Sequence, residues 1–168
     1  MHKFILVLSI IISTQSDAQN DLSKTAFLEK WENSQTYLIG IAEAMPATSY
    51  DFSPTKRQMS FREQLIHISD NMNWLGNSYF SADKIESLPK TSQKELIILH
   101  LKKSFLNVKN AVIATNPIEF SQKVDFFAGE KNKLQILNLL QDHVSHHRGQ
   151  LIVYLNLKNI NPPKYIGW

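Results

Sequence analysis

Apolar residues recur every three to four positions in four separate stretches of this 168-residue chain, at residues 22–45, 60–80, 92–116 and 132–158. This spacing places the apolar side chains on one face of an α-helix, whereas a half-buried strand would alternate at every second residue. Four amphipathic helices joined by loops predict a single all-α domain with the architecture of an antiparallel four-helix bundle. The spacing alone leaves the order of the helices open.

The predicted core consists of the large apolar side chains on these four faces. Its expected members are Phe27, Trp31, Leu38, Ile41, Ala42 and Met45 in the first stretch, Phe61, Leu65, Ile68, Met72, Leu75 and Tyr79 in the second, Ile98, Leu101, Phe105, Val108 and Val112 in the third, and Ile136, Leu140, Leu151 and Tyr154 in the fourth.

The ends of the helices carry their own signals. Ser60 with Glu63, and Ser92 with Glu95, match the capping box that begins a helix. Asn132 with Gln135 suits the start of the fourth helix. Asn159 suits the left-handed position that follows the last helical turn. Between the third and fourth helices, residues 124–127 suit a short extended or hairpin segment.

Residues 1–18 have the layout of a secretory signal peptide. A short basic start precedes the apolar run 4–12, and small residues at Ser16 and Ala18 suit a cleavage site. The apolar run is about half of the ~20 residues that cross a bilayer, so export is favoured over an uncleaved anchor. The alternative is a buried N-terminal helical turn. Cleavage after Ala18 leaves residues 19–168, which we expect to be periplasmic or secreted, with no stable membrane span.

Charge and cysteine content exclude several classes of function. The formal net charge is only +3 and the lysines are scattered, so nothing indicates a nucleic-acid partner. The chain has no cysteine, which excludes a thiolate nucleophile and a thiolate metal site. It also lacks a Gly-rich phosphate loop, a GxSxG elbow and an HExxH motif. Any metal would therefore be bound by His, Asp, Glu or water.

His143 and His147 stand four residues apart on the predicted fourth helix. Four residues are one helical turn plus ~40°, so both imidazoles leave the same side of the helix. Two neutral imidazoles on one face are able to bind a divalent metal. Both also lie on the apolar stripe, so the alternative is a pair of core histidines with ordinary hydrogen-bond partners.

His67 is the candidate third ligand, in the middle of the predicted second helix. It lies roughly 100° from the centre of the apolar stripe, on the flank that carries Asn71 and Trp74. A bundle helix contacts two neighbours, so a flank position is able to face the interior. A surface histidine is the alternative.

The remaining histidines fit the site less well. His146 lies about 100° round the helix from His147, which predicts a residue at the rim of the site or a donor to a ligand. His100 is isolated on the third helix, and we expect it at the surface or at its boundary.

Other polar residues near the histidines allow two interpretations each. Arg148 would bind an anionic group of a substrate or pair with a surface acid such as Asp142. Asp70 and Asp142 would orient imidazoles or simply lie on the surface. Gly149 inside a helix costs about 1 kcal/mol relative to alanine, which is typical of a position where a backbone or a ligand comes close.

Three segments, at residues 60–68, 143–151 and 154–163, resemble the DinB-like (DinB/YfiT) superfamily. Residues 60–68, Ser-Phe-Arg-Glu-Gln-Leu-Ile-His-Ile, resemble its second-helix motif. Residues 143–151, His-Val-Ser-His-His-Arg-Gly-Gln-Leu, resemble its HxxxHRGQ signature, and residues 154–163 resemble the usual end of its fourth helix. The resemblance spans roughly residues 22–165, with Asn159 at a position where many members have glycine.

The resemblance implies a DinB/YfiT-type bundle in up-down-down-up order, with one divalent metal ion held by His67, His143 and His147. Zinc is the first choice, with nickel, iron and manganese as alternatives. Members include thiol S-transferases and a thiol-dependent isomerase. We therefore expect an exported metal-dependent enzyme of the hydrolase or thiol-transferase type. The alternative is a non-catalytic metal- or small-molecule-binding bundle. The sequence predicts neither the substrate nor the catalytic residues, and it leaves homodimerisation open.

Overall fold

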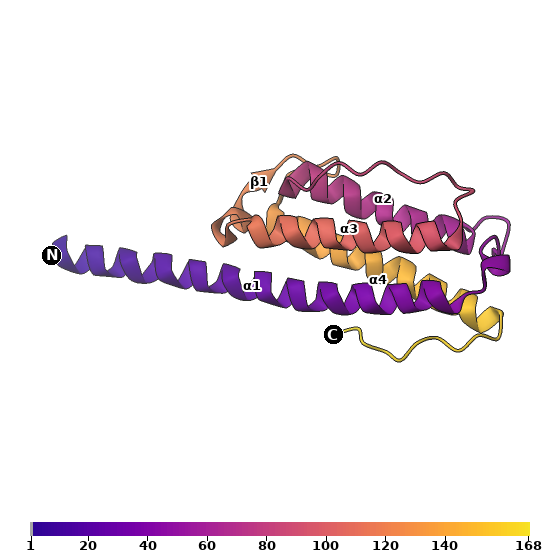
Figure 1. The fold of residues 1–168 in the computed structure, drawn as a ribbon. Helices are drawn as coiled ribbons and strands as arrows, with labels where there is room; N and C mark the ends of the chain where they lie inside the picture. The colour runs from indigo at the N-terminus through magenta and orange to yellow at the C-terminus, as the bar shows by residue number, and fades with distance from the viewer. Residues whose placement is uncertain (1) are drawn as a thin grey trace.

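The fold is a bundle of four α-helices (Figure 1). The computed structural model describes residues 2–168, with side chains from residue 22 onward. The predicted signal peptide, residues 1–18, lies outside the residues whose side chains are described, and it stays a prediction. None of the described helices is both long and apolar enough to cross a membrane.

The four long helices are joined by short 3-10 helices and one small hairpin. In chain order the elements are α1 (His2–Ala44), η1 (Ala47–Ser49), α2 (Phe61–Phe80), α3 (Lys94–Ala114), η2 (Pro117–Ser121), β1 (Lys123–Val124), β2 (Lys131–Asn132) and α4 (Lys133–Leu157). The strands β1 and β2 pair antiparallel, so a hairpin is present in the predicted region. Of the predicted residues 124–127, only Val124 belongs to a strand, and residues 125–127 lie in the connecting loop. The first helix extends well beyond its predicted start, back to His2.

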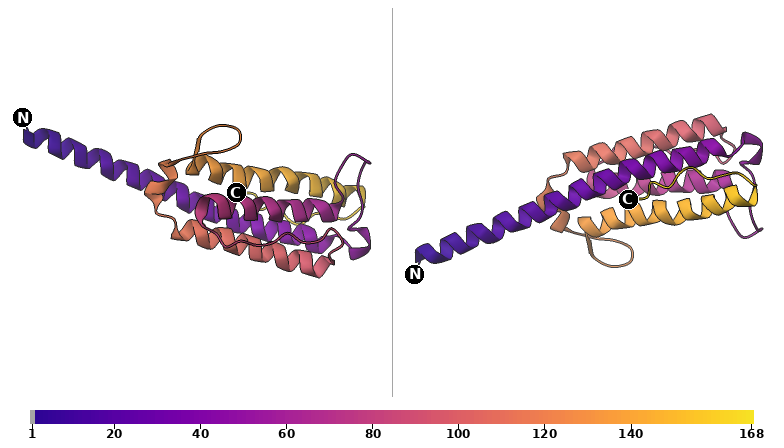
Figure 2. Two further views of the ribbon diagram at one scale, coloured as in Figure 1. Left: turned by 90° about the horizontal axis from the view of Figure 1, so that it is seen from above. Right: turned by 90° about the horizontal axis from the view of Figure 1, so that it is seen from below.

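The helices run in up-down-down-up order. α2 and α3 run parallel to each other, and the segment 81–93 returns the chain along the length of the bundle between them (Figures 1 and 2). α1 and α4 run in the opposite direction (Figure 1). α2 packs against both α3 and α4. This arrangement places the inner flanks of α2 and α4 opposite each other.

The capping predictions were correct for two helices and wrong for one. Ser60 and Glu63 form a complete capping box at α2, whereas Ser92 caps nothing. The backbone amide of Ser92 donates to the Pro89 carbonyl at 2.9 Å, and its carbonyl accepts from Arg62. Since this turn holds Ser92 outside the helix, α3 begins at Lys94 with no side-chain cap.

The last helix has the ends that the sequence predicts. Asn132 and Gln135 form a capping box at its start. Asn159, just beyond its end, has a φ of 56°, in the left-handed region. An asparagine tolerates this conformation better than most residues other than glycine.

The predicted apolar stripes form one core, with Tyr79 and Ile98 only partly buried. Trp31 is fully buried between Phe27 and Phe105, and its indole N–H donates to the Phe105 carbonyl at 3.1 Å. The prediction for His100 was wrong, because this residue is buried. Burial lowers the pKa of its imidazole, and nearby Asp70 opposes the shift.

Candidate metal centre

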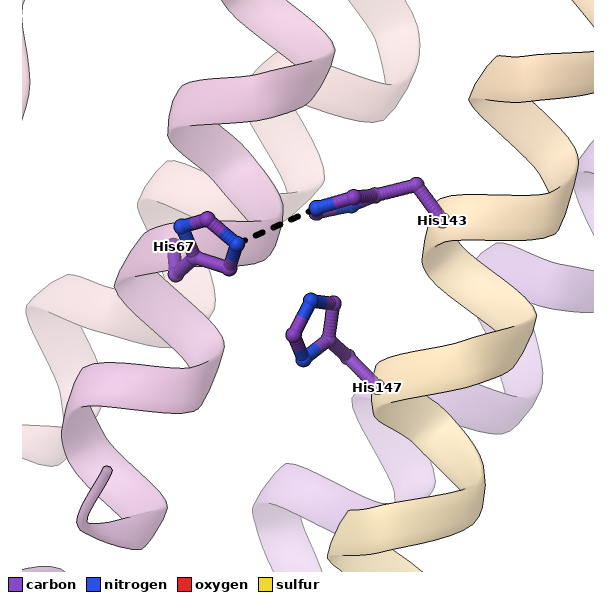
Figure 3. A group of neighbouring side chains, drawn as sticks. All are labelled: His67, His143 and His147. Carbon is purple, nitrogen blue, oxygen red and sulfur yellow. Dashed lines mark hydrogen bonds between the residues drawn. The ribbon is translucent and has the colours of Figure 1, made fainter. Parts of the chain in front are cut away.

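Three histidines from two helices meet inside the bundle (Figure 3). His67 comes from α2, and His143 and His147 come from α4. The Nε2 atoms of His67 and His143 lie 3.1 Å apart, and one ligand nitrogen from each of the three rings lies within 4.8 Å of the other two. The structure therefore brings together all three residues that the sequence singled out.

The spacing of the nitrogen atoms suits a small divalent ion. In a tetrahedral zinc site with Zn–N bonds of ~2.0–2.1 Å, two ligand nitrogens stand about 3.3 Å apart. The 3.1 Å separation between His67 and His143 is close to that value. The remaining separations between ligand nitrogens are at most 4.8 Å, so a bound ion would draw the three rings closer together.

The helix geometry explains why these rings converge. His143 and His147 lie one turn apart on the face of α4 that packs on α2. His67 lies on the flank of α2, and that flank faces α4 because α2 sits between α3 and α4. The ring centroid of His67 is 4.9 Å from that of His143 and 4.7 Å from that of His147. The alternative of a surface histidine at position 67 is therefore wrong.

Burial keeps two of the three imidazoles neutral. Desolvation, reinforced by the neighbouring histidines, lowers the pKa of His143 to about 3. The same two causes lower the pKa of His147 to about 4. Neutral imidazole has a nitrogen lone pair available for a metal, whereas the protonated ring has none. At neutral pH both rings are in the form that binds metal.

Gln64 orients one of the candidate ligands, a role that the sequence pattern alone did not reveal. Its Oε1 lies 2.5 Å from Nδ1 of His147. A carbonyl oxygen only accepts, so Nδ1 carries the proton and Nε2 keeps the lone pair. Gln64 precedes His67 by three residues, so the two side chains share one side of α2. That spacing is the signal that could have identified it.

A second glutamine extends this network to the surface. The Nε2 of Gln64 donates to Oε1 of Gln150 at 2.6 Å. The Nε2 of Gln150 lies 3.1 Å from Nε2 of His146, which is exposed. The prediction of His146 as a rim residue is confirmed, because its ring is exposed and is connected to the candidate ligands through the two glutamines and a ring contact with His147.

The predicted carboxylate partners do not reach the histidines. Asp70 accepts a hydrogen bond from the Ser87 hydroxyl at 2.8 Å, and Asp142 is exposed. Among the described residues, neither makes a hydrogen bond or ion pair with a histidine of the cluster. On this chain an amide, rather than a carboxylate, orients the candidate ligand.

Arg148 and Gly149 also differ from their predicted roles. Arg148 is buried, with its Nη1 3.3 Å from the Ser34 hydroxyl and its guanidinium 5.0 Å from the centre of the Tyr37 ring. It therefore faces α1 rather than Asp142, and the expected surface ion pair is absent from the described residues. Gly149 is exposed and has open space around it, so no neighbouring backbone requires a glycine there.

Solved structures share this fold at low sequence identity. A DinB-like protein from Bacillus cereus matches with a TM-score of 0.72 and 16% identity, over 83% of this chain and 95% of that one. A DinB-like protein from Bacillus subtilis matches with a TM-score of 0.70 and 15% identity, over 83% and 96%. A conserved protein from Enterococcus faecalis matches with a TM-score of 0.64 and 12% identity, over 79% and 95%.

Sequence comparison identifies the family. No curated protein sequence matches this chain. The model of the DinB family matches residues 17–164, which include both helices that carry the histidines. Together with the shared bundle, this match shows that the chain belongs to the DinB family.

Proposed function

We propose that this DinB-family protein binds one divalent metal ion through His67, His143 and His147 and acts with it on a small-molecule substrate. The observation that carries the proposal is the convergence of three imidazoles from two helices, with two Nε2 atoms 3.1 Å apart. The depressed pKa values of His143 and His147 support it, because they keep both rings neutral at physiological pH.

Zinc is the ion that we propose, since three imidazole ligands in a compact site suit it well. Nickel, iron and manganese are the competing ions. A bound ion of this kind supplies Lewis acidity to a substrate at the coordination position that three protein ligands leave open. The reaction class that we propose is hydrolysis or thiol transfer.

The surrounding residues of the chain would position the ligands. Gln64 holds His147 in the tautomer that leaves Nε2 free. Gln150 connects Gln64 to the exposed ring of His146.

A non-catalytic metal-binding protein is the second candidate, and one observation favours it. Neither Asp70 nor Asp142 contacts the three histidines, and no other carboxylate among the described residues does so. The site therefore lacks the carboxylate base that many hydrolytic metal sites use.

Metal analysis of protein purified without a His-tag tests the proposed site. We expect one zinc ion per chain, and an affinity that falls at least about 100-fold in His67→Ala, His143→Ala and His147→Ala. His146→Ala is the matched control, since it removes an adjacent imidazole and should bind zinc nearly as well as the parent protein. An unchanged zinc affinity in His143→Ala would remove the proposal.

Cobalt substitution separates the two candidate functions. An open coordination position predicts that the visible spectrum of the cobalt protein changes when a small thiol is added. A spectrum that is insensitive to thiols and other small ligands would favour the non-catalytic alternative.

We also propose that the protein is exported. The support is the basic, apolar and small-residue layout of residues 1–18. N-terminal sequencing of protein recovered outside the cytoplasm should begin at Gln19. A start at Met1 would contradict both cleavage and the proposed signal peptide.

A further inference from the structure

The outer face of α3 carries a second apolar stripe, distinct from the stripe that faces the core. Four large side chains on it are between 47% and 64% exposed: Leu96, Leu99, Leu106 and Ile113. With the exposed Lys103 and Asn110 they follow the alternating spacing of three and four residues that defines a coiled-coil seam. The stripe covers about 27 Å of helix, and α3 lies at the outside of the bundle (Figures 1 and 2).

We propose that this stripe is a homodimer interface, in which the α3 helices of two copies pack antiparallel about a two-fold axis between Lys103 and Leu106. Several large apolar side chains exposed along one face of a helix are typical of a protein–protein contact rather than of a free surface. A two-fold contact uses the same patch on both copies, so the patch must be complementary to itself.

The spacing along the stripe meets that condition when the two helices run in opposite directions, because it is symmetric about a point between Lys103 and Leu106. Leu96 then faces Ile113 of the second copy, and by symmetry Ile113 faces Leu96 of the second copy. Leu99 faces Asn110, and Lys103 faces Leu106. In the parallel arrangement each residue faces its own counterpart, so the two Lys103 side chains would meet, which is unfavourable for like charges.

Charge also favours the antiparallel arrangement. The groove between α3 and the segment 81–93 is lined by Asp83, Lys84, Lys103, Leu106 and Asn110, among others. Lys84 pairs with Glu86 at 2.8 Å. Asp83 is tied to α3 by two hydrogen bonds with Asn107, at 3.1 and 2.8 Å. Because Lys103 of the second copy packs at the level of Leu106, its ammonium group comes beside Asp83. The same pair forms a second time across the axis.

The flanks of the stripe leave room for a partner helix. On one side, Lys102 and Lys109 bend toward α1, where they pair with Glu43 and Glu32. On the other side, Asn107 is held by Asp83. The charged side chains next to the seam are therefore engaged within their own copy and do not cover the apolar row.

Sedimentation velocity over a range of protein concentrations tests the proposal. We expect a monomer–dimer equilibrium, and a dissociation constant at least about tenfold higher in Leu106→Lys, which places two lysines opposite each other. Leu157→Lys is the matched control, because Leu157 is 55% exposed and Leu106 is 53% exposed, and it should leave dimerisation unchanged. A protein that is monomeric at all concentrations, or a Leu106→Lys dimer as tight as the parent, would overturn the proposal.

Two further experiments test the direction of the helices. Lys103→Glu should weaken the dimer, and adding Asp83→Lys to it should restore the dimer by exchanging the charges. Because the chain has no cysteine, a mixture of Leu99→Cys and Asn110→Cys proteins should form a mixed disulfide under oxidation. Crosslinking of Leu99→Cys to itself, in preference to the mixed product, would show a parallel pair and overturn the antiparallel assignment.

Discussion

Gln64 accepts a hydrogen bond from Nδ1 of His147 at 2.5 Å, and this contact joins α2 to α4 at the candidate metal centre. Gln64 and His67 come from the same helix, so α2 contributes both a proposed ligand and the group that orients a ligand on the opposite helix. The tautomer of His147 is therefore set by a side chain 83 positions away in the sequence.

Replacing Gln64 should weaken metal binding without removing any ligand. In Gln64→Leu the imidazole of His147 loses its acceptor, and we expect zinc affinity to fall about 10- to 100-fold. Titration with a competing chelator measures the change. Gln150→Leu is the control, since it removes the neighbouring amide but leaves the hydrogen bond between Gln64 and His147. It should lower zinc affinity much less than Gln64→Leu. Equal losses in the two variants would contradict the orienting role of Gln64.

The metal-free protein should lose stability as the pH falls from about 6.5 toward 4. The unfolded chain binds protons on its histidines near pH 6.5, whereas burial holds the pKa of His143 at about 3 and that of His147 at about 4. Protons therefore bind the unfolded chain preferentially in this range, and each histidine lowers the unfolding free energy by at most about 1.4 kcal/mol per pH unit. Above pH 7 the effect should vanish.

Urea unfolding of the chelator-treated protein at pH 7 and pH 5 measures this loss. The double variant His143→Gln/His147→Gln should show a smaller difference between the two pH values than the parent protein. His146→Gln, which changes an exposed ring, should behave like the parent. A parent protein whose stability is the same at both pH values would rule out the buried neutral state of the two rings.

Two serines that look alike in the sequence should differ in their effect on stability. Ser60→Ala removes a hydroxyl that accepts from the Glu63 amide at 3.2 Å, and we expect a loss of about 1 kcal/mol. Ser92→Ala removes a hydroxyl that caps no helix, and we expect a change within about 0.5 kcal/mol. Urea unfolding at constant pH compares them, and a larger loss in Ser92→Ala would mean that α3 begins at the predicted position after all.

The tryptophans offer a similar comparison for the core. Trp31 is fully buried and hydrogen-bonded, so Trp31→Ala should cost about 3–5 kcal/mol. Trp74 is 44% exposed and stacks on Phe126 in the hairpin loop, so Trp74→Ala should cost less than about 1.5 kcal/mol. Thermal unfolding followed by circular dichroism measures both. Similar losses would mean that the hairpin loop is as important for stability as the core.

The sequence predicted those features that depend on spacing along one helix. The apolar stripes, the capping boxes at Ser60 and Asn132, and the shared face of His143 and His147 all follow from helical periodicity. Predicting His67 as a ligand needed information beyond helical spacing. Its position on the flank of α2 faces the interior only because α2 lies between α3 and α4. The resemblance to the DinB family supplied that arrangement, and the spacing did not.

The incorrect predictions concern contacts between elements that are distant in the sequence. Ser92 fails as a cap because Arg62 and Pro89 hold it in a turn. His100 is buried because α3 packs against both α1 and α2. Arg148 turns to Ser34 and Tyr37 on α1 instead of a nearby acid. In each case a partner 30 or more residues away in part decides the outcome, and local patterns contain no information about it.

The separation of the histidines along the chain determines the stage of synthesis at which the three-histidine cluster can form. His67 and His143 are 76 positions apart, and the fourth helix is the last to be synthesised. A nascent chain that has completed only α2 and α3 holds one of the three histidines of the cluster, His67, without His143 and His147. Capture of the proposed ion would therefore follow the synthesis of α4, and the compartment where the chain finishes folding would determine which metals are available to it.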